Sequence, residues 1–145
     1  MKKIRDKLKQ LLFSDSNEEF FKLVQLLSDT STVESITELL LTLDDDYDYY
    51  DEMNTLMHAV ERADVTIVYE ATISNLEQLN AQAPEWCETI IKRHLNAVGG
   101  ISDRFDAFKF IEMSKGSPSA YSVMKVVATD LLDKNKIPEI IRQEL

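Results

Sequence analysis

The sequence predicts an all-α protein, and three observations lead to this fold class. Only three glycines and three prolines occur among 145 residues, which is too few for the many turns of an all-β fold. Apolar residues recur at helical spacing, and no stretch alternates with period two for long enough to demand a strand. Helix-capping signals recur about every 15 to 19 residues. We therefore expect about eight or nine short antiparallel helices in one domain, residues 1–145, as stacked helical hairpins in an α-solenoid-like or compact array.

The first half of the chain contains four helical patterns. Their apolar faces are formed by Ile4, Leu8, Leu11 and Leu12, then by Phe20, Leu23, Val24 and Leu27, then by Ile36, Leu39, Leu40 and Leu43, and last by Met53, Leu56, Met57 and Val60. Ser16 with Glu19 matches a capping box ahead of the second helix. Ser31 with Glu34 repeats this signature, so we expect Ser31 to cap the third helix.

The second half contains four further helices and a short terminal one. Asp64 is the expected cap of a fifth helix, and the β-branched run from residue 65 to 69 follows it. Proline favours the first position of a helix, so we expect Pro84 to begin a sixth helix. This helix should end at Gly99-Gly100 and bury Trp86. The remaining expected helix starts are Ser102 and Asp103 for a seventh helix carrying Phe105, Phe108 and Ile111, Ser117-Pro118 for an eighth, and Pro138 for the last.

The charge balance limits the partners of the protein. The formal net charge is −10, although residues 1–13 are locally basic. Nucleic acids and anionic membranes would repel such a surface, so we expect no direct binding to either and instead a cationic protein partner. No run of about 18 apolar residues could span a bilayer, and no signal peptide is evident. Cys87 is the single cysteine and cannot form an intramolecular disulfide, which favours a reducing, cytoplasmic location.

One stretch differs from the rest of the chain by its density of charge and aromatic rings. It consists of Asp44, Asp45, Asp46, Tyr47, Asp48, Tyr49, Tyr50, Asp51 and Glu52. Carboxylates this close repel one another unless a positive partner offsets them. Tyrosine offers a stiff apolar ring with a polar tip, as contact surfaces require. We expect this acidic stretch to bind a basic macromolecule, against the alternative of a solvated loop followed by a helix N-terminus.

Calcium binding is the sharpest alternative for the acidic stretch. Asp44, Asp46 and Asp48 match the first three ligand positions of an EF-hand loop. Tyr49 then occupies the position that needs glycine, and Thr55 occupies the position that needs a bidentate glutamate. The sequence therefore predicts no specific calcium site, and we expect no metal or other cofactor.

The sequence contains no arrangement that indicates catalysis. Cys87 and His94 share a face of the sixth expected helix, but seven residues separate them by about 10.5 Å along its axis, too far for a direct dyad. Glycine-rich phosphate loops, nucleophile elbows and metalloprotease signatures do not occur. We therefore expect a protein that is not an enzyme.

Two segments resemble the immunity protein 30 family of bacterial polymorphic-toxin systems. They are YDEMNTLMHAVE at residues 50–61 and APEWCETIIKRHLN at residues 83–96. The resemblance implies a small helical cytoplasmic protein that neutralises a cognate toxin, including toxins of contact-dependent growth inhibition. It also implies a nuclease as the toxin, with EndoU-type ribonucleases among the known associations. An acidic surface suits this partner, because a basic nuclease groove would attract it before the active site is covered.

A second class of protein fits the same composition. An acidic helical adaptor or secretion chaperone for a cationic protein would also be small, cytoplasmic and negatively charged. The two classes predict different behaviour, because an immunity protein should protect cells from a toxin encoded directly ahead of it. A chaperone should promote export and leave toxicity unchanged.

Overall fold

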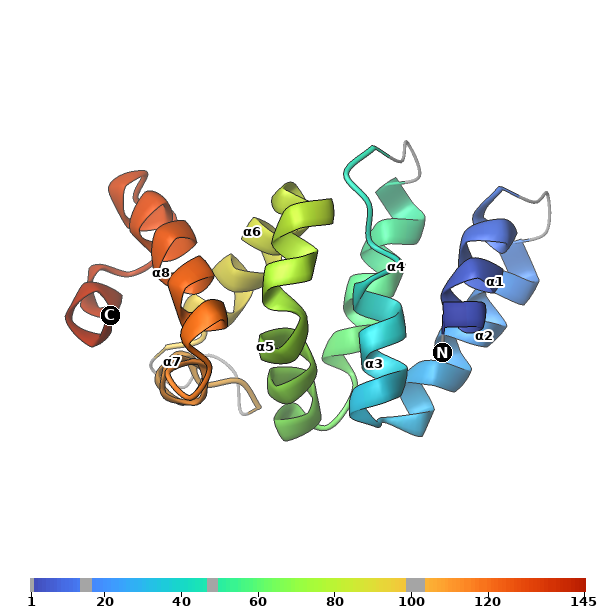
Figure 1. Ribbon diagram of the computed structural model, residues 1–145, viewed down its shortest axis with the longest axis horizontal. Helices are drawn as coiled ribbons and strands as arrows, with labels where there is room; N and C mark the ends of the chain where they lie inside the picture. Colours follow the sequence, from blue (N-terminus) through green and yellow to red (C-terminus); the bar gives the residue numbers. More distant parts are fainter. Residues whose placement is uncertain (1, 14–16, 47–49, 99–103) are drawn as a thin grey trace. The chain divides into compact units, whose positions relative to one another are not determined.

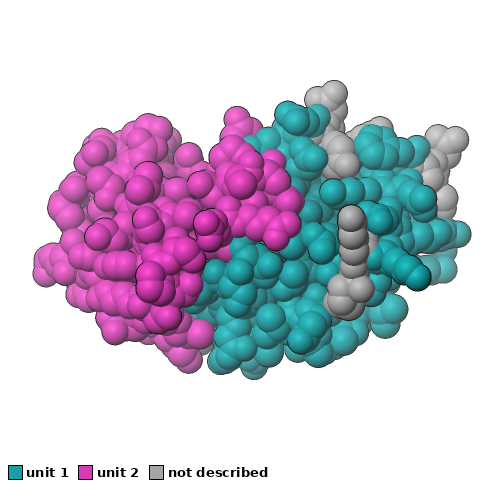
Figure 2. Space-filling view, viewed as in Figure 1, with its two compact units in different colours: residues 1–75 teal, residues 76–145 magenta. Residues whose placement is uncertain are grey.

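The computed structural model describes residues 2–13, 17–46, 50–98 and 104–145, and within these ranges every regular element is helical (Figure 1). The sequence-based prediction of an all-α fold is therefore confirmed. The chain divides into two compact units, residues 1–75 and residues 76–145 (Figure 2). Helix α5, Val65–Gln82, crosses this division. That residues 1–145 form one domain stays a prediction.

Unit 1 is built from helices that reverse direction at each connection (Figure 1). These helices are α1 (Lys2–Leu12), α2 (Asn17–Thr30), α3 (Val33–Leu40), α4 (Tyr50–Glu61) and the first part of α5. Helix α1 packs against α2 and α3, and α4 packs against the same two helices. Helices α1–α2 and α3–α4 thus form two antiparallel hairpins that stack on each other, as the alternation of caps and apolar faces predicts.

The core of unit 1 uses the apolar faces expected from the sequence. Its fully buried side chains include Leu8, Phe20, Ile36, Leu39, Leu40, Met53, Leu56 and Tyr69. Each such side chain contributes roughly 1.5–3 kcal/mol relative to an exposed position. Polar contacts also cross between these helices: Arg5 Nε donates to Glu38 Oε2 at 2.8 Å, and Ser28 Oγ donates to the carbonyl oxygen of Ala59 at 2.7 Å.

The start of α3 differs from the prediction by one residue. Thr32 caps the helix, with its side chain accepting from Ser35 N while Ser35 Oγ accepts from Thr32 N. Ser31 instead adopts the left-handed backbone conformation, with φ of 50°, and its hydroxyl accepts from Asp64 N at 3.1 Å. Ser31 therefore ends α2 and also contacts the residue that caps α5. The expected cap at Ser16 lies outside the described residues.

Unit 2 contains the rest of α5, then α6 (Pro84–Leu95), α7 (Ala107–Ser114), α8 (Pro118–Asp133) and a terminal 3₁₀ helix, η1 (Glu139–Glu144). Pro84 and Pro118 occupy the first turns of their helices, as expected, and Trp86 is buried. Helix α6 ends at Leu95, earlier than the expected glycine pair, because the chain turns at Asn96. The expected caps at 102 and 103 lie outside the described residues.

Helix α7 buries Ile111 as predicted, but Phe110 is buried in place of Phe105 and Phe108. Asp106 caps it by accepting from Phe108 N at 3.0 Å, so the helical register starts at Ala107. The buried residues are Ala107, Phe110, Ile111 and Ser114. Phe110 packs edge-on against buried His94, with ring centroids 4.7 Å apart. Phe105 lies before the helix and also contacts His94, so His94 is enclosed by aromatic rings.

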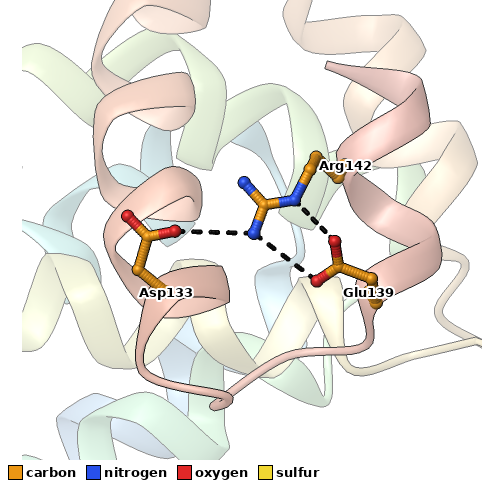
Figure 3. Close-up of polar contacts among 3 residues, drawn as sticks. All are labelled: Asp133, Glu139 and Arg142. Carbon is orange, nitrogen blue, oxygen red and sulfur yellow. Dashed lines mark hydrogen bonds and ion pairs between the residues drawn. The ribbon is translucent and has the colours of Figure 1, made fainter.

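The C-terminal helix is fastened to α8 by one arginine (Figure 3). Arg142 Nε donates to Glu139 Oε1 at 2.6 Å, and Arg142 Nη2 donates to Asp133 Oδ1 at 3.4 Å. The hydrogen bond from Arg142 lowers the pKa of the exposed Glu139 carboxyl below its ordinary value. Ile141 of the same helix is fully buried.

Candidate functional site

The acidic stretch follows α3 and leads into α4, at one end of unit 1 (Figure 1). Asp44 and Asp45 are partly exposed and Asp46 is exposed. Tyr50 begins α4, and the first turn of that helix carries exposed Asp51 and partly exposed Glu52. Tyr47, Asp48 and Tyr49, which we also predicted as partner-binding residues, lie outside the described residues.

Buried side chains hold the acidic stretch on both sides. Leu41 and Leu43 follow α3 and are 3% and 1% exposed, and Met53 in α4 is fully buried. At residues 44–46 the backbone is ordered locally by Asp44, whose Oδ1 accepts from Asp46 N at 2.9 Å. The described carboxylates therefore project from a segment whose two ends are fixed in the core of unit 1.

The first turn of α4 is a favourable place for two of these carboxylates. Asp51 and Glu52 lie in the first turn of the helix, at the positive end of its dipole. Each such charge stabilises the helix by about 0.3–1 kcal/mol. The local structure thus offsets part of the repulsion between neighbouring carboxylates and leaves their outer faces available to a partner.

Charge is distributed unevenly between the two units. Residues 1–75 contain 7 Lys and Arg against 16 Asp and Glu, which gives a formal charge of −9. Residues 76–145 contain 9 Lys and Arg against 10 Asp and Glu, which gives a formal charge of −1. The acidic character of the protein therefore belongs to unit 1, which also contains the acidic stretch.

The structure places the residues considered for chemistry in the core. Cys87 is fully buried, and His94 is 4% exposed against aromatic rings. In the described part of the chain, no group of three or more His, Cys, Asp or Glu side chains is arranged to hold a metal ion. Across the same residues, no helix is both long enough and apolar enough to cross a membrane.

These features define a class of helical binding protein whose acidity is concentrated in one unit. The family model described as Immunity protein 30 matches residues 7–100, about two thirds of the chain. The chain belongs to the Immunity protein 30 family, and its role is that of an immunity protein against a toxin. Both segments that carried the resemblance lie inside the matched range. Neither the curated proteins nor the solved structures include a match to this chain.

Proposed function

We propose that this immunity protein binds and neutralises a basic nuclease toxin by covering its active site with unit 1. The toxin we propose is an EndoU-type ribonuclease of a contact-dependent growth inhibition system, and we place the complex in the cytoplasm. The observation that carries the proposal is the charge of unit 1, −9 against −1 for unit 2, in a member of a toxin-immunity family. A nuclease must attract phosphates with a basic groove, and an acidic surface can occupy that groove.

The acidic stretch, Asp44 to Glu52, is the proposed contact surface. Its carboxylates steer the basic toxin during diffusional encounter, which raises the association rate at low salt. Its tyrosines act as anchors that lose water on binding and slow dissociation. Inhibition then needs no catalysis by the immunity protein, since occupation of the groove excludes the substrate.

The test is protection of cells by co-expression. The toxin domain encoded directly ahead of this chain's gene is expressed from an inducible promoter, with and without the immunity protein. We expect growth to stop with the toxin alone and to recover with the pair, and the two purified proteins to form a complex that has lost nuclease activity. A toxin that is secreted in greater amount but remains fully toxic would instead indicate a secretion chaperone.

A further inference from the structure

We infer that the toxin-binding surface extends from the acidic stretch onto the start of α2, where Phe21 serves as an apolar anchor for the basic toxin. This inference rests on the proposed function and names a second part of the same surface. The usual size of protein interfaces is the first reason to expect a second part of this surface. A stable interface uses about 20–30 residues on each side, and the acidic stretch supplies nine.

Hydrogen bonds between helices show that α2 and α4 run parallel and in register. Ser28 Oγ donates to Ala59 O across a sequence separation of 31, and Asp64 N donates to Ser31 Oγ across a separation of 33. If the sequence separations of 31 and 33 hold along both helices, Glu19 in α2 lies level with residues 50–52 at the start of α4. The first turn of α2 therefore lies at the height of the first turn of α4, where the acidic stretch ends (Figure 1).

One exposed phenylalanine belongs to this end of unit 1. Phe21 is 43% exposed in α2, whereas neighbouring Phe20 is fully buried and meets it edge-on at 5.6 Å. A partly exposed ring at the height of the acidic stretch gives a partner of that stretch an apolar contact.

The charges around Phe21 indicate which partner covers it. Glu18 and Glu19 are exposed in the first turn of α2, so two parallel helix starts present carboxylates together with this ring. Glu18 also pairs with Lys22 at 3.1 Å, but both side chains are largely exposed and such a pair is readily exchanged. A cationic toxin complements this surface. A second copy of unit 1 would instead be repelled, because each copy carries a formal charge of −9.

The experiment measures the binding kinetics of Phe21→Ala with the cognate toxin domain, which we expect to be encoded directly ahead of this chain's gene. We expect the change to raise the dissociation rate about tenfold, as removal of an anchor does, and to leave the association rate within about twofold. Val126→Ala in unit 2 is the matched control, because Val126 is 70% exposed in the nearly neutral unit. Its kinetics should equal those of the unchanged protein.

The outcomes separate this inference from the proposed function. If the unchanged protein does not bind the toxin, the proposed function fails. If it binds and the Phe21→Ala variant dissociates at the unchanged rate, the inference is overturned and the function stands. Equal effects of Phe21→Ala and Val126→Ala would also overturn it. Circular dichroism verifies folding, and Phe21→Lys, which a cationic toxin repels, is a second variant that should weaken binding more than Phe21→Ala.

Discussion

Arg5 and Glu38 form a largely buried ion pair that joins α1 to α3, with Arg5 Nε 2.8 Å from Glu38 Oε2. The Glu38 side chain is 2% exposed, whereas that of Arg5 is 24% exposed. A carboxylate without access to water requires such a partner, because an unpaired buried charge is strongly unfavourable. The pair therefore fixes the first helix of unit 1 on the second hairpin.

Loss of Arg5 should cost more stability than loss of both partners. We expect Arg5→Leu to lower the free energy of unfolding by about 2 kcal/mol, since Glu38 would remain buried without its cation. The double change Arg5→Leu with Glu38→Leu should recover at least half of that loss, because no buried charge is left. Urea unfolding of the single and double variants measures the coupling. Equal losses in the two variants would show that the ion pair is not what holds α1.

Replacement of Thr72 should raise the stability of the fold, whereas replacement of Arg5 should lower it. Its hydroxyl is fully buried in α5 and has no hydrogen-bond partner among the described residues. Thr72→Val keeps the shape and removes this polar group, so we expect a gain of about 1 kcal/mol in unfolding free energy. Thr42→Val is the matched control, because Thr42 is equally buried but donates to Glu38 O at 2.7 Å. Thermal melts should rise for the first variant and stay level or fall for the second.

Local signals in the sequence predicted most of the fold. Asp64 caps α5 through Thr66 N and Ile67 N, and Pro84 opens α6, because capping and fixed φ act within a few residues. For α7 these local signals are ambiguous, because Asp106 also precedes an apolar stretch; Asp106 caps the helix, and Phe110 is among its buried residues. The Arg5–Glu38 pair joins residues 33 apart. No local spacing predicts such a contact.

For the candidate site, too, local features can be predicted from the sequence and contacts between distant segments cannot. The density of charge marked Asp44 to Glu52 directly in the sequence, and its described aspartates are at least partly exposed. Phe21 follows Phe20, which fits the helical stripe with Val24 and Leu27, so helical periodicity alone does not single out Phe21. The sequence does offer one signal of an exposed anchor, because Phe21 is an aromatic residue outside the buried stripe. Its position beside the start of α4 depends on the register of two helices, which only the structure provides.

The contact between Arg142 and Glu139, both in η1, predicts that the stability of this helix depends on pH. The hydrogen bond from Arg142 lowers the pKa of Glu139, so this contact stabilises the folded chain above the ordinary carboxyl pKa. That stabilisation should be lost as pH falls through the lowered pKa. The methyl signals of Ile141, followed by nuclear magnetic resonance between pH 6 and 2, should shift in this range. Glu139→Gln should remove the transition, and an unchanged titration in that variant would assign it to another group.

Carboxylates and tyrosines of the acidic stretch should affect different steps of toxin binding. Exposed charges act mainly through steering, which salt screens beyond about 8 Å under physiological conditions. Replacing Asp44, Asp45, Asp46 and Asp48 by Asn should therefore lower the association rate with the toxin domain and flatten its salt dependence. The amide oxygen that Asp44→Asn introduces could still accept the hydrogen bond from Asp46 N, so the local turn should persist.

Alanine at Tyr47, Tyr49 or Tyr50 should instead raise the dissociation rate, by about tenfold for each 1.4 kcal/mol of lost contact. Stopped-flow association at several salt concentrations, followed by competition with unlabelled protein, gives both rates for each variant. Circular dichroism confirms that the Asn variant is folded, and relief of mutual repulsion should if anything stabilise it. A folded Asn variant that associates at the unchanged rate in low salt and still protects cells would show that the acidic stretch is a solvated loop, and the toxin would then have to bind another face of unit 1.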